Sequence, residues 1–153
     1  MNSPSLIHDA LAAAPLLAGL EPAALALLES EGIVRNFATG EAVVSEGDPG
    51  HSFFILAEGD VEVVKQDGHN GQTLLARLHR GTFFGEMCVV NPMPRAATVR
   101  ALVPVTAIEI RAGTLHHLFS KMPAQYAIVL LNLARDMARR LRTLDEAFAA
   151  RAL

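Results

Sequence analysis

Short strand candidates separated by glycine-containing turns fill the middle of the chain and restrict most strongly how it can fold. The clearest apolar, β-branched or aromatic runs lie within residues 33–111, at 43–44, 53–56, 61–64, 73–75, 97–99 and 105–110. Glycine-containing turns near residues 40, 47–50, 59, 68 and 81 separate these runs. Evenly spaced short strands with such turns are typical of sandwiches and jelly rolls. We therefore expect a sandwich or jelly roll between residues 33 and 111.

Helical patterns flank this region on both sides. Between residues 3 and 30, leucines recur at roughly helical spacing, Pro15 and Gly19 interrupt the run, and Pro22 fits the first turn of a second short helix. A short helix is expected from Thr114 to about residue 122, and a long one from Pro123 to about residue 150. The expected fold class is mixed and mainly β: a β-roll (double-stranded jelly roll) flanked by N-terminal helices and a long C-terminal helix. We expect one domain over residues 1–153, with helices in 1–32, the β-roll in 33–111 and helices in 112–153.

The long C-terminal helix carries a narrow apolar stripe. Its positions step by four and three, as in the seam of a coiled coil: Leu130, Ala134, Met137, Leu141, Leu144 and Phe148. At ~1.5 Å per residue this helix would be roughly 40 Å long and would overhang a domain of this size. We therefore expect a homodimer joined through it. The basic run Arg135, Arg139, Arg140 and Arg142, interrupted by acidic residues, is expected to be the solvated face.

Composition excludes several classes of protein. Apolar residues make up 51% of the chain, which suits a folded domain with a core rather than a disordered segment. A net charge of −3 gives no sign of a nucleic-acid or membrane surface. The single cysteine and the absence of a basic N-terminal leader favour the cytoplasm, and the apolar stretch 11–20 is too short to span a bilayer. The six histidines lack metal-ligand spacing and no catalytic set stands out, so we expect neither a metal site nor an enzyme.

The segment 81–99 carries the groups that best suit a ligand. Arg95 offers a planar fork of donors to phosphate oxygens. Backbone N–H groups after Gly85 can point at the same oxygens if a helical turn starts there. An ionised Glu86 can only accept hydrogen bonds, so it would repel a bare phosphate and bind a sugar hydroxyl. Together these groups fit a sugar phosphate better than inorganic phosphate.

The residues around Glu86 and Arg95 also match a known pattern. Residues 84–87 read Phe-Gly-Glu-Met, and residues 94–99 read Pro-Arg-Ala-Ala-Thr-Val. This segment resembles the phosphate-binding cassette of the cyclic-nucleotide-binding domain family, which includes catabolite activator proteins, regulatory subunits of cyclic-AMP-dependent protein kinase and cyclic-nucleotide-gated channels. The Glu-to-Arg spacing is that of the kinase subunits, whereas Cys88 stands where the family usually has Ala. The order of helix, β-roll and helix is also the family's, so the resemblance covers nearly the whole chain.

The resemblance implies a non-catalytic sensor of a purine 3′,5′-cyclic nucleotide. It implies that Arg95 binds the cyclic phosphate, that Gly85 and the N–H groups of Met87 and Cys88 complete the anion site, and that Glu86 accepts the ribose 2′-OH. Ala96 and Ala97 line the same pocket in this interpretation; Ala96 favours cyclic AMP, although cyclic GMP remains a possible ligand. In the family the long C-terminal helix both dimerises and closes over the base, which makes Leu141, Thr143 and Leu144 candidate base contacts.

The means of signalling stays open at the level of the sequence. Transcription regulators of this family continue into a helix-turn-helix of roughly sixty residues. The chain ends at Leu153, so we expect a standalone sensor, or a piece of a larger protein, that acts through an unknown protein partner and does not itself bind nucleic acid. Three alternatives remain: a dimeric scaffold with a non-binding pocket, favoured by Cys88; a receptor for another ligand such as a cyclic dinucleotide; and a cupin-like enzyme, for which His51, His69 and His79 lack the H-x-H pattern.

Overall fold

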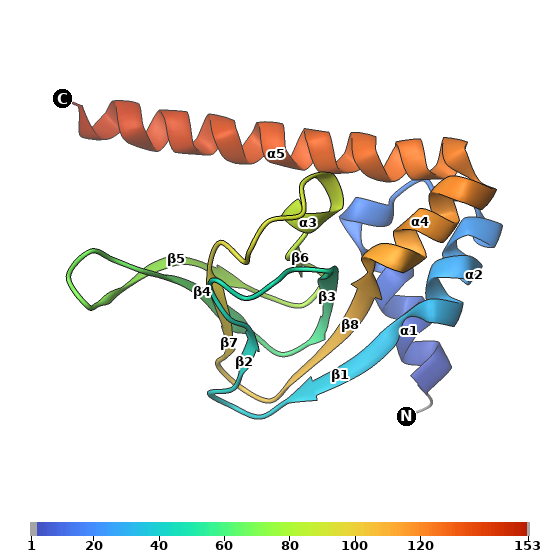
Figure 1. Ribbon diagram of the computed structural model, residues 1–153, viewed down its shortest axis with the longest axis horizontal. Helices are drawn as coiled ribbons and strands as arrows, with labels where there is room; N and C mark the ends of the chain where they lie inside the picture. Colours follow the sequence, from blue (N-terminus) through green and yellow to red (C-terminus); the bar gives the residue numbers. More distant parts are fainter. Residues whose placement is uncertain (1–2, 153) are drawn as a thin grey trace.

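Two antiparallel four-stranded sheets face each other and form a β-roll in the computed structural model, which describes residues 3–152. One sheet has the strand order β1-β8-β3-β6 and the other β2-β7-β4-β5. The strands are β1 (Ile33–Phe37), β2 (Ala42–Val44), β3 (Ser52–Glu58), β4 (Val61–Gln66), β5 (Gln72–Leu78), β6 (Phe83–Phe84), β7 (Thr98–Ala101) and β8 (Val105–Arg111). The expected mixed fold, a β-roll flanked by N-terminal helices and a long C-terminal helix, is confirmed (Figure 1). More of its residues lie in helices than in strands, because the C-terminal helix is so long.

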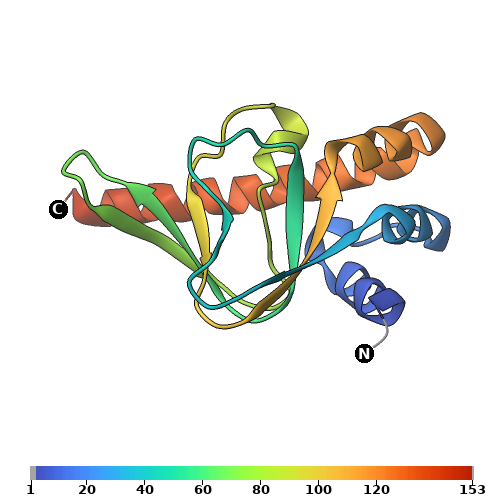
Figure 2. The ribbon, with the colours of Figure 1, turned by 60° about the horizontal axis from the view of Figure 1, so that its bottom comes forward.

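Helices cover one end of the roll and cross over it (Figure 2). They are α1 (Ser3–Ala13), the 3₁₀ helix η1 (Pro15–Leu17), α2 (Pro22–Glu31), α3 (Met87–Val90), α4 (Ala112–Lys121) and α5 (Pro123–Arg151). Pro22 and Pro123 each lie in the first turn of a helix, where the missing N–H has no intrahelical acceptor to lose. None of the described helices is long and apolar enough to cross a membrane.

β3 separates the two parts of the hydrophobic core. Phe54 and Leu56 point into the roll, whereas Phe53 and Ile55 point outward against the helices. Because successive strand residues face opposite sides, a strand covered on both faces reads as a continuous apolar run. The sequence did not predict β1 or β6 as strands, since β1 carries Arg35 and Asn36 and β6 spans only two residues.

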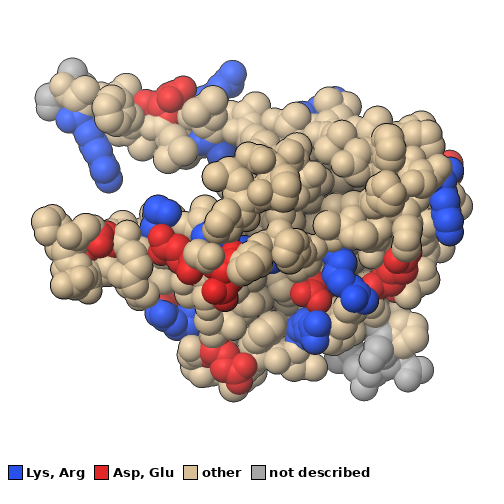
Figure 3. Space-filling model, viewed as in Figure 1, with Lys and Arg blue, Asp and Glu red and all other residues tan. Residues whose placement is uncertain are grey.

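α5 packs on the domain through its N-terminal half and projects beyond it through its C-terminal half (Figure 1). Val129 and Leu133 are buried, and Met137 packs on the core of its own chain. Figure 3 shows an open cleft between the projecting half of α5 and the β4–β5 hairpin. The expected apolar stripe is therefore divided: Met137 is used inside the domain, whereas Leu141, Leu144 and Phe148 are 60%, 66% and 78% exposed.

Candidate functional site

The segment between β6 and β7 begins with a glycine whose conformation and position both require the absence of a side chain. Gly85 has φ +79°, which L-residues rarely adopt. A Cβ added there would lie 2.6 Å from Nη1 of Arg95 and 3.3 Å from the carbonyl oxygen of Ser52. Gly85 thus turns the chain from β6 into α3 and lets the guanidinium of Arg95 lie directly against the backbone.

The backbone of Arg95 is clamped by the turn between β2 and β3. Its N–H donates to the carbonyl of Asp48 (2.8 Å), and its carbonyl accepts from the N–H of Gly47 (2.9 Å). Gly50 lies beside the side chain, where a Cβ would come within 3.2 Å of Nε of Arg95. The glycine-containing turn 47–50 therefore fixes where the arginine leaves the chain.

The guanidinium of Arg95 contacts neutral groups. It donates from Nη1 to the carbonyl of Gly85 and from Nη2 to the hydroxyl of Ser52, both at 3.4 Å, and lies 5.9 Å from the ring centroid of Phe54. Within residues 3–152, Arg95 forms no ion pair, and in particular none with Glu86. A hollow of about 340 Å³ opens beside it, with walls from β2, the 45–51 turn, β3 and β8. Two bonds at the long end of the hydrogen-bond range leave its charge available to an anion.

Glu86 is buried and bound by an arginine of the long helix. Its residue exposure is 4%, and its Oε1 accepts from Nη1 of Arg140 at 2.6 Å. Arg140 also lies over the ring of Phe83, 5.7 Å from the centroid, and its Nε lies 2.9 Å from Oδ2 of Asp136. Arg140 is exposed, as expected of the solvated face, but α5 packs close enough for this arginine also to compensate a buried carboxylate. The other oxygen of Glu86 has no protein partner among the described hydrogen bonds.

Met87 and Cys88 form the first turn of α3. Backbone N–H groups in the first turn of a helix have no intrahelical acceptor. The side chain of Met87 is 55% exposed, whereas the thiol of Cys88 is partly buried and donates to the carbonyl of Ser52 at 3.3 Å. Burial raises the pKa of the Cys88 thiol, which keeps it protonated at neutral pH. The side chain of Cys88 is therefore accommodated in this turn as a neutral thiol.

Ala96 and Ala97 continue from Arg95 toward β7, and a lysine holds this part of the segment. Nζ of Lys65 donates to the carbonyl of Ala96 at 2.6 Å and lies 3.3 Å from Oε1 of Glu46. The backbone N–H of Gln66 donates to Glu46, which lowers the pKa of that carboxyl, and Lys65 lowers it further. The chain beside Arg95 is therefore tied to β4.

The candidate base contacts on α5 lie apart from this cluster. Thr143 and Leu144 are exposed, and the hydroxyl of Thr143 donates to the carbonyl of Arg139. Both residues lie one turn beyond Arg140, at helix spacings that share its face. The structure brings Gly85 and Arg95 together directly and joins Glu86 to α5 through Arg140, whereas it leaves Thr143 and Leu144 exposed to solvent.

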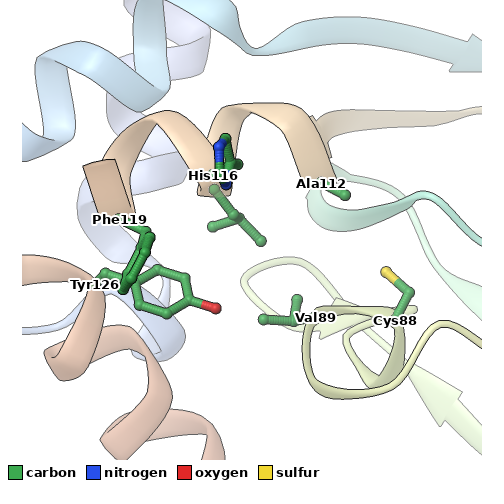
Figure 4. Close-up of a pocket in the computed structure, with 7 residues that line it drawn as sticks. Cys88, Val89, Ala112, His116, Phe119 and Tyr126 are labelled. Carbon is green, nitrogen blue, oxygen red and sulfur yellow. The ribbon is translucent and has the colours of Figure 1, made fainter. Parts of the chain in front are cut away.

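A second hollow, of about 240 Å³, lies between α3 and the α4–α5 corner (Figure 4). Cys88 and Val89 face Ala112, His116, Phe119 and Tyr126 across it, and the rings of Phe119 and Tyr126 meet edge to face with centroids 5.4 Å apart. The residues that line it include no arginine or lysine, whereas Arg95 lines the first hollow. No group of His, Cys, Asp and Glu able to hold a metal ion occurs in the part of the chain that the structure describes.

Sequence reasoning missed Ser52, Glu109 and Arg140. Arg140 lies seven residues beyond the buried Leu133 and so shares the packed face of α5, a signal that the stripe of leucines obscured. Glu109 follows the buried Val105 and Ala107 at alternate positions of β8, and Ser52 is the first residue of the buried run in β3. A polar residue at an inward-facing strand position is the signal that could have identified both.

The chain is similar to known proteins over most of its length. The chain matches the family model described as "Cyclic nucleotide-binding domain" over residues 34–122. It is 35% identical over 123 residues to the cAMP-dependent protein kinase regulatory subunit of Mycosarcoma maydis, a match that covers 80% of this chain and 23% of that protein. It is 28% identical over 136 residues to the CRP-like cAMP-activated global transcriptional regulator of Mycobacterium tuberculosis, covering 89% of this chain and 59% of that protein. The chain thus spans less than two thirds of either relative's length.

A solved structure shares the fold over nearly the whole chain. The cyclic nucleotide-binding domain from Methylobacillus flagellatus superposes with a TM-score of 0.83, covering 99% of this chain and 86% of that chain at 22% identity. The β-roll, the helices at its end and the long C-terminal helix are therefore a recurring arrangement.

Proposed function

Because this chain belongs to the cyclic nucleotide-binding domain family, we propose that it is a non-catalytic sensor that binds cyclic AMP in preference to cyclic GMP. The observation that carries the proposal is Arg95: it is clamped at its backbone, lies against Gly85 and has no carboxylate partner within residues 3–152. A fixed, uncompensated guanidinium beside an open hollow is suited to a singly charged phosphodiester. A 3′,5′-cyclic phosphate is such a group.

The remaining groups suit the sugar and the phosphate oxygens. Arg95 binds the exocyclic oxygens, and the N–H groups of Met87 and Cys88 add donors on the side of Gly85. The oxygen of Glu86 that Arg140 leaves unused accepts the ribose 2′-OH, which is free in a 3′,5′-cyclic nucleotide. Arg140 binds Glu86 from the other side, so the positive charge of its guanidinium lies next to this carboxylate.

The base preference is supported from two directions. Ala96 places no hydroxyl beside the base, whereas family members that select cyclic GMP tend to carry Thr or Ser at that position. The names of both relatives described above refer to cAMP. Ala97 lines the same wall, and Leu141, Thr143 and Leu144 on α5 complete the base site when that helix closes over the cleft.

The output is proposed to pass through α5 to a protein partner. α5 contacts the site through Arg140, and its projecting half presents Leu141, Leu144 and Phe148 to solvent. Ligand binding at Glu86 therefore acts on the same element that offers the exposed apolar surface. We propose that this half of α5 joins two copies of the chain and that nucleotide shifts its position.

A thermal-shift experiment tests the proposal. Ligand at ~100 times its Kd adds about 2.7 kcal/mol to the free energy of unfolding, which raises Tm by about 5–10 °C in a chain of this size. We expect this rise with cyclic AMP in protein stripped of carried-over nucleotide, and its loss in Arg95→Ala. No shift with millimolar cyclic AMP contradicts the proposal and favours a non-binding scaffold, whereas a shift with a cyclic dinucleotide alone favours a different ligand.

A further inference from the structure

The interior of the roll changes from apolar to polar at the end where Arg95 enters. On the inward face of β8, Val105 and Ala107 are buried in the apolar core, and Glu109 continues the same row. On β3, Phe54 is in that core and Ser52 continues its row. Ser52 is 8% exposed, and the side chain of Glu109 is 15% exposed. Two polar side chains thus replace core residues at the wall of the hollow beside Arg95.

Strand pairing brings these side chains into contact. Phe54 pairs with Glu109 and Ser52 with Arg111, so Ser52 and Glu109 are diagonal neighbours across β3 and β8. The hydroxyl of Ser52 donates to Oε2 of Glu109 at 3.1 Å. From the far side, Nη2 of Arg35 on β1 donates to Oε1 of Glu109 at 3.0 Å. A row of hydrogen bonds therefore crosses three strands and ends at Ser52, whose hydroxyl oxygen accepts from Nη2 of Arg95.

The direction of the Ser52 hydroxyl follows from the chemistry of this row. A hydroxyl has one proton and two lone pairs, and an ionised carboxylate can only accept. Glu109 therefore accepts the hydrogen bond that the Ser52 hydroxyl donates, and the lone pairs of the hydroxyl oxygen face Arg95. Arg35 offsets the charge of Glu109 from outside, so Arg95 is oriented by a neutral oxygen and keeps its own charge for the ligand.

We propose that Ser52 and Glu109 are positioning residues for the anion site: Glu109 fixes the orientation of the Ser52 hydroxyl, and that hydroxyl fixes Nη2 of Arg95 for the phosphate. This inference rests on the proposed function, because it assigns Arg95 the role of phosphate ligand. A carboxylate placed directly on Arg95 would compete with the ligand, whereas a hydroxyl orients the guanidinium without that competition. Nε and the remaining Nη hydrogens stay available to phosphate oxygens.

Two conservative changes test the proposal in the full chain. Glu109→Gln keeps the size of the side chain but introduces a donor, so the Ser52 hydroxyl can reverse and point its proton at Arg95. Ser52→Ala removes the hydroxyl. We expect each change to weaken cyclic AMP binding roughly tenfold, within the range of coupling energies for residues in one hydrogen-bond network. Glu62→Gln is the matched control, because Glu62 pairs with Arg100 at 3.4 Å in the other sheet.

A double-mutant cycle separates positioning from a general loss of structure. In an Arg95→Lys background, which keeps the charge but has no Nη2, Glu109→Gln should have little further effect on affinity. A loss of the same size in both backgrounds, or an equal loss in Glu62→Gln, overturns the proposal. Ser52→Thr, which retains the hydroxyl, should bind more tightly than Ser52→Ala; equal binding by the two variants also counts against it.

NMR of the arginine side chain decides the same question without nucleotide. In the nucleotide-free protein, the Arg95 guanidinium should give ¹⁵N resonances of a restricted group, and these should broaden or shift in Ser52→Ala and Glu109→Gln but not in Glu62→Gln. Unchanged Arg95 resonances in both variants overturn the positioning role. Failure of the wild type to bind cyclic AMP would refute the proposed function instead. The NMR measurement would still show whether Ser52 and Glu109 orient Arg95.

Discussion

Arg95 is surrounded by groups that hold it without neutralising it. Three polar residues are buried across the described chain: Ser52, Glu86 and Thr114. The first two lie in the candidate site: Ser52 contacts Arg95, and Glu86 follows Gly85 in the chain and binds Arg140. Burying a polar group is unfavourable unless it is hydrogen-bonded, and both are: Ser52 donates to Glu109, and Glu86 accepts from Arg140.

Glu86 should determine whether the site distinguishes ribose from deoxyribose. A hydrogen bond to a charged group contributes about 1.5–3 kcal/mol, so the wild type should prefer cyclic AMP over 2′-deoxy cyclic AMP by roughly tenfold or more. Glu86→Gln should reduce this preference strongly, because the remaining amide cannot supply an ionic acceptor, and Glu62→Gln should retain it. Competition titrations with the two nucleotides measure the ratio. A Glu86→Gln protein that still discriminates as the wild type does would refute the role given to this carboxylate.

Gly85 and Gly81 form a matched pair for testing close approach to Arg95. Both have positive φ, +79° and +93°, so replacing either by Ala costs about 1–2 kcal/mol of backbone strain. A Cβ at Gly85 would also meet Nη1 of Arg95 at 2.6 Å, whereas nothing lies within 4 Å at Gly81. We expect similar losses of stability from the strain but a large loss of cyclic AMP affinity only in Gly85→Ala. Equal affinities in the two variants would show that Arg95 need not lie against this backbone.

At the scale of the element, α5 is the helix that touches both the site and the solvent. Replacing Arg140 by Gln leaves the buried Glu86 without its ionic partner. Breaking a fully buried pair costs about 3–5 kcal/mol, and the half-exposed Arg140 side chain should reduce this to about 1–2 kcal/mol of stability. Cyclic AMP affinity should fall in parallel. Arg142→Gln, on the same helix at an exposed position, serves as the control. Denaturant unfolding and cyclic AMP titration are measured on both variants. Equal stability and equal affinity of the two variants would contradict a role of α5 in the site.

The elements differed in how readily their sequences revealed them. β3 and β8 were predictable because they are apolar over several residues, and the prolines at 22 and 123 marked helix starts. β1 was not predicted, because its Arg35 and Asn36 interrupt the apolar run although its pairing with β8 fixes it as a strand. A local sequence pattern can indicate only one element at a time, whereas β1 is stabilised by hydrogen bonds to β8, about seventy residues further along the chain.

The residues of the candidate site that lie in one segment of the chain were predictable from the sequence. Those contributed by separate strands and by α5 were not. Gly85, Glu86 and Arg95 lie within eleven residues of sequence and match a recognisable pattern. The groups that orient them, Ser52, Glu109 and Arg140, come from distant parts of the chain. Their polar side chains become significant only once packing shows that they face inward.

At the scale of the whole molecule, the projecting half of α5 remains the feature that a single chain does not cover. Leu144 and Phe148 are highly exposed there, and we expect them to lie in a dimer interface. Leu144→Glu combined with Phe148→Glu should therefore give monomers in sedimentation. Leu131→Glu, also exposed at 49% but on another face of α5, should not. A monomeric wild type, or dissociation by Leu131→Glu alone, would contradict the proposed interface.

The most direct test of the account is an equilibrium titration of nucleotide-free protein with cyclic AMP and with 5′-AMP, which carries the same base and ribose but an open, more highly charged phosphate. The account predicts one cyclic AMP per chain with roughly micromolar or tighter affinity, much weaker binding of 5′-AMP, and a loss of about 2–5 kcal/mol of cyclic AMP binding energy in Arg95→Ala. Cyclic AMP binding that Arg95→Ala leaves unchanged, or no binding by the wild type at millimolar concentration, would contradict it.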